Sequence, residues 1–231
     1  MEYVIEVRNV TKEYKGRVIL EGINLKIEKG ATVGIIGANG SGKSLLFKIL
    51  VGLVKPDSGE VYIRGEQLGK KADFPDRVGI LINAPGYIEL YSGFQNLQFL
   101  ASIQDKITDE EIQNKVQYIR NTMKMVRLNP DDKTKVKNYS MGMKQKLGIA
   151  QAIMENQDII ILDEPFNALD YQSNREIKAI IKKLQKEKRT ILLTSHNFRD
   201  IDSLCSEIYA IEESHLETFT EEMKKYYLDE E

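Results

Sequence analysis

The sequence predicts an α/β fold, because short β-branched apolar runs alternate with segments of helical periodicity. Ala31–Ile36 is an apolar run of strand length, and Leu45–Leu50, soon after it, has helical character. Asp158–Leu162 is a continuous apolar run, typical of a central parallel strand, and the amphipathic segment Ser173–Glu187 follows it. From Gly93 to Glu155 strands disappear and helical periodicity takes over. The expected architecture is a mixed sheet with flanking helices and an inserted helical subdomain.

Before this core, the chain has the composition of an antiparallel β subdomain. Val4–Val7 and Val18–Ile27 resemble strands and are joined by a turn around Lys15-Gly16. Glu60–Arg64 follows a Pro-Asp-Ser-Gly turn and is expected to be a strand, as is Arg77–Ile82.

The helical insertion and the C-terminal part give weaker signals. Thr108–Glu111 supplies a capping box and an acidic first turn. Apolar residues at helical spacing follow it, namely Ile112, Val116, Ile119, Met123 and Val126. Further on we expect a core strand at Thr190–Thr194, a hairpin formed by Ile208–Ile211 and Leu216–Phe219, and a short helix or frayed end after Thr220.

The composition is that of a soluble globular protein with one large domain. The chain has 231 residues, of which 42% are hydrophobic and 29% charged. The net charge of −2 gives no electrostatic reason to expect nucleic acid as a partner. Cys205 is the only cysteine, so no internal disulfide forms, and we expect it to be a small buried side chain. No basic-then-apolar leader and no apolar run of about 20 residues is present.

The loop between Ala31–Ile36 and Leu45–Leu50 fits the phosphate-binding pattern G-x-x-x-x-G-K-[ST]. Glycines let its backbone N–H groups approach phosphate oxygens, and the following helix presents its positive end to the same anion. Lysine supplies a point charge for the outer phosphates, and the serine hydroxyl suits Mg²⁺. A glycine-rich turn with a chance lysine would not fill every fixed position, so we predict a nucleotide site. Its residues are Gly37, Ala38, Asn39, Gly40, Ser41, Gly42, Lys43, Ser44 and Leu45.

Two acidic residues follow the apolar run Asp158–Leu162. Because an α/β sheet places its active site at the carboxyl ends of its strands, Asp163 is a candidate to hold Mg²⁺ and Glu164 to activate water. The alternative is an acidic helix start before Pro165. His196 follows the next expected strand and is a candidate to contact phosphate or relay a proton.

Tyr14 precedes the first turn and has two interpretations that the residues alone leave open. Its ring can stack on a nucleotide base or cover the edge of the sheet.

Several ordered motifs make the chain resemble an ABC-type ATPase, the nucleotide-binding subunit of an ABC transporter, from Val4 to about Phe219. Besides the phosphate-binding loop and the acidic pair, they are the signature-like Tyr139–Leu147, Asn167–Asp170 and Ser195-His196. Ser140 precedes Asp163 by 23 residues. The resemblance implies one ABC-type ATPase domain over 1–231. Its α/β core and β subdomain would occupy 1–84 and 157–220, its helical subdomain 85–156, and a short tail 221–231.

The family implies a composite site, in which one subunit binds MgATP and the signature of another subunit completes the site. Ser140, Met141 and Gly142 match the signature positions that face the partner's nucleotide, and Asp170 matches the aspartate that couples the two sites. His196 matches the switch histidine, and Tyr14 the aromatic residue that stacks on the base. Without the resemblance, Ser140 would be interpreted only as a helix cap.

Two departures from the family pattern stand out. The usual Leu-Ser-Gly-Gly-Gln is Tyr-Ser-Met-Gly-Met here, a variant similar to that of bacterial exporter ATPases for peptide antibiotics or drugs. Asn83 replaces the loop glutamine that helps to hold Mg²⁺, so the implied metal ligands are Ser44, Asp163 and Asn83.

The resemblance also implies partners and a location. Gly79–Tyr91 is the expected docking surface for transmembrane permease subunits. The subunit would work as a homodimer or as a heterodimer with a related ATPase. It would be cytoplasmic and peripheral on the inner face of the membrane.

Three other functions compete with transport. The first is an ABC-type ATPase acting on ribosomes or DNA, against which stand the single ATPase domain and the lack of a basic arm. The second is a nucleotide-gated switch, in which the altered signature and Asn83 have weakened catalysis. The third, a kinase with this loop, would leave the signature without a purpose.

Overall fold

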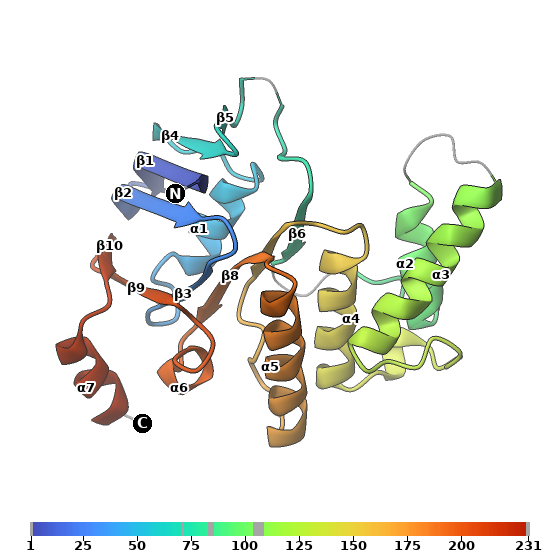
Figure 1. Ribbon diagram of the computed structural model, residues 1–231. Helices are drawn as coiled ribbons and strands as arrows, with labels where there is room; N and C mark the ends of the chain where they lie inside the picture. Colours follow the sequence, from blue (N-terminus) through green and yellow to red (C-terminus); the bar gives the residue numbers. More distant parts are fainter. Residues whose placement is uncertain (1, 71, 83–85, 104–108, 230–231) are drawn as a thin grey trace.

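Two sheets form the framework of the molecule (Figure 1). The structure is a computed structural model that describes residues 2–70, 72–82, 86–103 and 109–229. The first sheet has the strand order β2-β1-β4-β5 and is antiparallel, with β1 (Tyr3–Tyr14), β2 (Arg17–Glu28), β4 (Ser58–Ile63) and β5 (Glu66–Gln67). The second has the order β10-β9-β3-β8-β7-β6, with β3 (Thr32–Ile36), β6 (Val78–Leu81), β7 (Ile159–Leu162), β8 (Thr190–Ser195), β9 (Glu207–Glu212) and β10 (His215–Thr218). All neighbours in it pair in parallel except β9 and β10.

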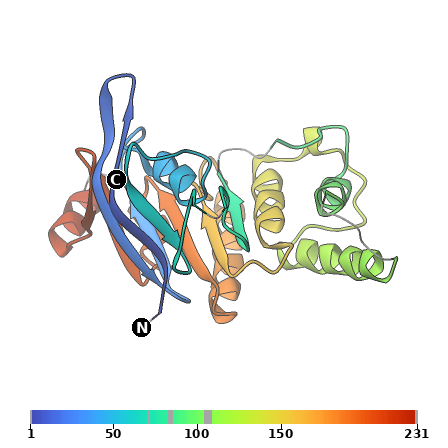
Figure 2. The same ribbon diagram turned by 90° about the horizontal axis from the view of Figure 1, so that it is seen from above.

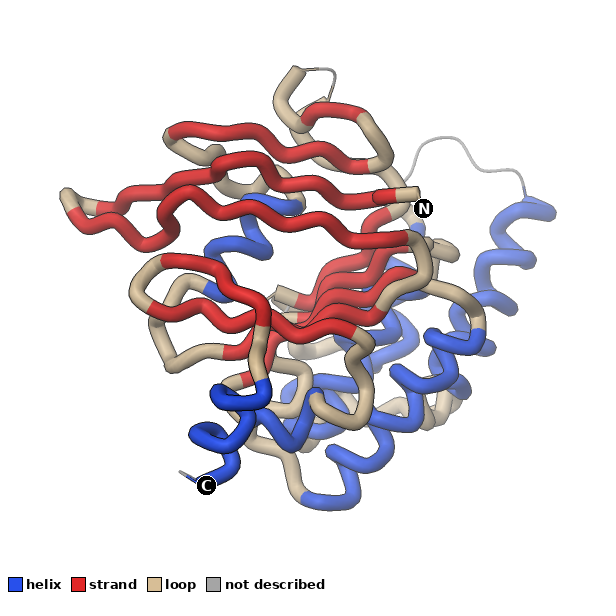
Figure 3. Tube along the Cα trace, turned by 60° about the vertical axis from the view of Figure 1, so that its left-hand side comes forward, coloured by secondary structure: helices blue, strands red, loops and turns tan. Residues whose placement is uncertain are grey.

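Helix α1 (Lys43–Leu50) lies between the two sheets (Figure 3). Its buried Phe47 and Leu50 belong to the same core as Ile5 of the first sheet and Leu192 of the second. Because α1 follows the phosphate-binding loop directly, this packing fixes that loop at the carboxyl edge of β3.

The opposite face of the parallel sheet is covered by helices. They are α4 (Met141–Ile153), α5 (Tyr171–Lys186) and the short α6 (Phe198–Ile201), on which α7 (Glu221–Asp229) packs. Figure 2 shows that α2 (Gly93–Ala101) and α3 (Asp109–Met125) lie to one side of the sheet, with α4 between them and the sheet. A short 3₁₀ helix, η1 (Val136–Asn138), precedes α4. Helices α2 to α4 therefore form the predicted insertion.

The predicted fold class is confirmed. The predicted elements differ from the observed ones at their ends, and β5, η1 and α6 were not predicted. Arg64 and Arg77 are not strand residues, because both have a positive φ, of 50° and 51°, that breaks the strand. Helix α5 begins at Tyr171 rather than Ser173, because the Asp170 side chain caps it by accepting from the Ser173 N–H. The capping box predicted for α3 begins at Thr108, which lies outside the described residues.

Candidate nucleotide site

The loop before α1 has the backbone geometry that close approach to an anion requires. Gly40 and Gly42 have φ values of 84° and 106°, in the region that favours glycine. A Cβ on Gly42 would lie 2.9 Å from Leu20, and one on Gly37 would lie 2.7 Å from Ser41 Oγ. Gly42 is therefore required both by conformation and by space, whereas Gly40 is required by conformation alone.

Lys43 folds back over this loop. Its Nζ donates to the carbonyls of Gly37 and Ala38, at 2.7 and 3.1 Å, and lies 3.4 Å from Glu164 Oε1. The side chain is 5% exposed. The ammonium therefore sits where the loop and the acidic pair meet, so phosphates in the loop would take it as a partner in place of the two carbonyls.

Asp163 and Glu164 follow β7 at the carboxyl edge of the sheet. The Asp163 N–H donates to Leu81 O at 2.7 Å, and Thr194 Oγ1 donates to Asp163 Oδ1 at 2.8 Å. Glu164 has a φ of 47°, a conformation that a residue with a side chain rarely adopts. The described residues contain no helix that begins at this pair, so the alternative of an acidic helix start is wrong.

His196 completes this cluster from the neighbouring strand. Its Nδ1 lies 2.9 Å from Glu164 Oε2. The turn that carries it is fixed by Ser195, whose Oγ accepts from the Asn197 N–H at 3.0 Å. Glu164 thus lies between two groups that can carry positive charge, Lys43 and His196, which come from elements far apart in the sequence.

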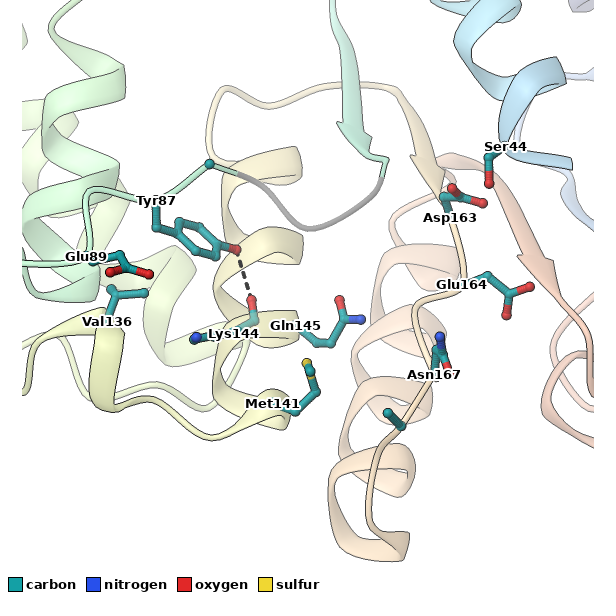
Figure 4. Close-up of a pocket in the computed structure, with 12 residues that line it drawn as sticks. Ser44, Tyr87, Glu89, Val136, Met141, Lys144, Gln145, Asp163, Glu164 and Asn167 are labelled. Carbon is teal, nitrogen blue, oxygen red and sulfur yellow. Dashed lines mark hydrogen bonds between the residues drawn. The ribbon is translucent and has the colours of Figure 1, made fainter. Parts of the chain in front are cut away.

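Beside this cluster opens a cavity of about 590 Å³. Figure 4 shows Ser44, Asp163 and Glu164 on one wall and Tyr87, Met141 and Lys144 on the other. The Tyr87 hydroxyl donates to the Lys144 carbonyl at 2.9 Å. This hydrogen bond ties the segment that begins at Gly86 to the first turns of α4. Burial raises the pKa of Tyr87 well above its usual value, so the phenol stays a donor.

The donor set in this cavity fits Mg²⁺. Ser44 offers a hydroxyl and Asp163 a carboxylate, and hard oxygen ligands are those that Mg²⁺ prefers. No group of three or more His, Cys, Asp and Glu residues suited to a metal occurs in the described part of the chain. An Mg²⁺ ion that accompanies a nucleotide takes its other ligands from phosphates and water. Asn83 lies outside the described residues.

The signature-like segment begins α4 as a capped helix. Ser140 accepts from the Met143 N–H at 3.2 Å, and Asp170 caps the neighbouring α5 in the same way. Ser140 and Asp170 are exposed, and Met141 is 53% exposed. Of Ser140, Met141 and Gly142, only Met141 lines the cavity, so Ser140 and Gly142 are not brought to the Lys43–Glu164 cluster within one chain.

Two predicted residues lie away from the cavity. Tyr14 is 64% exposed at the turn between β1 and β2, and Lys15 Nζ lies 5.6 Å from its ring centre. Cys205 is partly buried behind β3, where burial raises the pKa of its thiol to about 12. Sequence analysis missed Thr194 and Tyr87, because neither residue belongs to a motif and their hydrogen bonds reach distant segments.

Comparison with known proteins decides the family. Residues 20–167 match the family model described as ABC transporter. The uncharacterised ABC transporter ATP-binding protein YybJ of Bacillus subtilis is 39% identical over 93% of this chain and 95% of its own length. The chain belongs to the ABC transporter family.

The ABC subunit has relatives of named function as well. The bacitracin transport ATP-binding protein BcrA of Enterococcus faecalis is 34% identical over 94% of this chain and 68% of its own length. Among solved structures, a dimeric post-hydrolysis state of the ATP-binding cassette MJ0796, bound to ADP and Pi, is 27% identical. It has a TM-score of 0.78 and is matched over 94% of this chain and 99% of its own. The ABC subunit is therefore an ATP-binding and ATP-hydrolysing subunit of an ABC transporter.

Proposed function

We propose that this ABC subunit drives the export of a peptide antibiotic or a related drug through separate transmembrane subunits. The catalytic part of this proposal rests on the position of Glu164 between Lys43 and His196, beside a cavity that Ser44 and Asp163 also line. The likeness to a bacitracin transport ATPase supports the class of cargo.

In this proposal, the phosphate-binding loop Gly37–Leu45 and Lys43 hold the phosphates of ATP, and Tyr14 stacks on its base. Glu164 accepts a proton from the attacking water, and His196 contacts the γ-phosphate. Ser44 and Asp163, with Asn83, would hold Mg²⁺, which neutralises phosphate charge when it is bound. Positioning and charge stabilisation then supply most of the rate.

A second ATPase subunit completes the site in this proposal. Ser140, Met141 and Gly142 contact the partner's nucleotide in this proposal, which the exposure of Ser140 and Met141 at the start of α4 supports. Asp170 couples the two sites. The dimeric cassette of MJ0796 supports this arrangement.

The permease subunits dock on Gly79–Tyr91 in this proposal. Of its described residues, Ile88, Leu90 and Tyr91 are large hydrophobic side chains with exposures of 36%, 62% and 41%. In this proposal the core is formed by 1–84 and 157–220, the helical subdomain by 85–156 and the tail by 221–231. The docking surface spans the boundary between core and helical subdomain, and the signature lies in the helical subdomain. In the described part, no helix has the length and apolar character to cross a bilayer. The subunit would lie on the cytoplasmic face of the membrane, held by its permease.

The experiment that tests this proposal uses Glu164→Gln, which keeps the size of the side chain and removes its basicity. The purified variant is expected to bind ATP like the parent and to lose about 100-fold or more of its turnover. In cells of the source organism from which the gene for the subunit has been deleted, a gene for the unmutated subunit is expected to restore resistance to peptide antibiotics. A gene for Glu164→Gln is not expected to restore it.

Two outcomes would contradict it. Parental turnover in Glu164→Gln would exclude Glu164 as the base. Unchanged susceptibility of cells without the subunit would exclude export of peptide antibiotics. ATP binding without turnover in the parent itself would instead favour a nucleotide-gated switch.

A further inference from the structure

Thr194 lies in β8, beside the point where β7 ends in Asp163. Leu162 pairs with Leu193 in these two strands, so Thr194 is the next residue across from Asp163. Its side chain is fully buried, and the three residues before it in the strand are apolar. A hydroxyl costs free energy in such a place unless it is hydrogen-bonded. Its partners therefore indicate why a polar residue stands here.

Both hydrogen-bonding capacities of this hydroxyl are directed at the acidic pair. The Glu164 N–H donates to Thr194 Oγ1 at 2.8 Å, and Oγ1 donates to Asp163 Oδ1 at 2.8 Å. The direction follows from chemistry, because a backbone N–H can only donate and the hydroxyl proton is then left for the carboxylate. One hydroxyl thus fixes the side chain of one acidic residue and the backbone of the next.

The bond to the Glu164 amide has a second consequence. Glu164 is held at a φ of 47°, which persists only where the surroundings restrain it. In that conformation its carboxylate lies 3.4 Å from Lys43 Nζ and 2.9 Å from His196 Nδ1. Without the acceptor at Thr194, the backbone would be free to relax and to carry the carboxylate away from both groups.

We infer that Thr194 is a positioning residue for ATP hydrolysis, which orients the Asp163 carboxylate and the Glu164 backbone through a single hydroxyl. The inference rests on the roles proposed above for Asp163 and Glu164. It adds that Asp163 and Glu164, which follow β7, adopt the geometry that hydrolysis needs only when a residue of β8 supplies a hydroxyl.

Thr194→Val tests the inference, because valine has the shape of threonine and lacks the hydroxyl. We expect turnover to fall by about 10- to 100-fold, as is common when the partner of a metal ligand is removed. Binding of a fluorescent ATP analogue gives a readout that is independent of turnover. Mg²⁺ is expected to increase the affinity of the parent for this analogue, and in Thr194→Val that increase should be about 10-fold smaller. In EDTA, without free Mg²⁺, the variant and the parent should bind the analogue with equal affinity. Thr194→Ser, which keeps the hydroxyl, should restore both.

The matched control is Thr190→Val, at the other end of the same strand. Thr190 is 2% exposed, and its hydroxyl accepts from the Gly30 N–H at 2.9 Å, away from the cavity. Thr190→Val should change thermal stability, and it should leave unaltered the increase in ATP-analogue affinity that Mg²⁺ produces. If Thr194→Val does not fold, Thr194→Ala removes the same hydroxyl with a smaller side chain.

Parental turnover and a parental Mg²⁺ effect in Thr194→Val would overturn the inference. Asp163→Asn and Glu164→Gln separate this result from a failure of the proposed function. If those two variants also behave like the parent, the assignment of the acidic pair is wrong. If they lose function and Thr194→Val does not, only the role of Thr194 is wrong.

Discussion

Gly142 lies in the first turn of α4, where the chain packs against the start of α5. A Cβ at this position would lie 2.3 Å from Ser173 Oγ and 2.8 Å from Ser173 Cβ. The hydroxyl can rotate away, but the Cβ cannot. Gly142 is therefore required by packing within one chain, in addition to the contact with the partner's nucleotide that the family resemblance implies.

Gly142→Ala is expected to lower the free energy of unfolding by about 1–2 kcal/mol. Alanine gains about 1 kcal/mol of helix propensity, but overpacking costs about 1–3 kcal/mol, and contact at 2.8 Å between carbon atoms places this site at the upper end. Urea unfolding measures the change. Gly86→Ala is the control, because nothing lies within 4 Å of its added Cβ. Equal stability of Gly142→Ala and the parent would show that the contact with Ser173 costs no more than the roughly 1 kcal/mol that alanine gains in helix propensity.

At the scale of elements, an ion pair joins the same two helices one turn further on. Lys146 Nζ of α4 lies 2.6 Å from Glu176 Oε2 of α5, and the two side chains are 11% and 15% exposed. The hydrogen bond from Lys146, and after it that from Gln172, holds the pKa of Glu176 below its usual value of 4.5. Because Ser140 caps α4 and Asp170 caps α5, this pair holds the two capped helix starts next to each other.

Lys146→Met is expected to destabilise the protein by about 1.5–3 kcal/mol at pH 7, the range for hydrogen bonds to charged groups. The folded pKa of Glu176 lies below the unfolded one, so its stabilising contribution is complete above pH 4.5 and is lost as the pH falls through the folded pKa. The difference between parent and variant should therefore narrow below pH 4.5, as urea unfolding at a series of pH values will show.

Lys29→Met provides the control for this series. Lys29 pairs with Glu2 at 3.3 Å, but the side chains are 63% and 70% exposed. Such pairs contribute little, so a change below about 0.5 kcal/mol is expected. If the difference in free energy of unfolding between Lys146→Met and the parent stays constant from pH 7 to pH 3, the charge of Glu176 does not contribute to stability.

At the scale of the whole molecule, Ser140 and Asp170 do not line the cavity beside the cluster of Lys43, Glu164 and His196. Lys43, Glu164 and His196 cluster at the carboxyl edge of the sheet, whereas Ser140 and Asp170 lie exposed at the starts of α4 and α5. A site that uses both sets therefore needs a second chain.

The molecular mass of the Glu164→Gln variant, measured by light scattering, should double when MgATP is added. The bound ATP then joins two chains and is not hydrolysed. ADP should leave it monomeric. Adding Lys43→Ala to this variant should also keep it monomeric, because the loop then lacks its charge for the phosphates. A monomer at saturating MgATP would mean that the altered signature no longer joins two copies of this chain, or that membrane partners are needed to bring the sites together.

The sequence by itself determined the fold class, the phosphate-binding loop and the positions of the acidic pair and His196. The physical reason is that these features are local. Apolar periodicity distinguishes strands from helices, glycines mark where φ is positive, and carboxyl ends of parallel strands gather at one edge. The roles given to Ser140, Gly142 and Asp170 came from the family resemblance and stay predictions.

Only the tertiary structure decided which residues support that site. Thr194 contacts Asp163 and Glu164, Tyr87 contacts Lys144, and Lys146 contacts Glu176. The partners in these pairs are at least 30 residues apart. Their meeting depends on strand order, register and helix packing, which local periodicity does not specify. A buried hydroxyl in an apolar strand gives no signal in the sequence until the strand beside it is known.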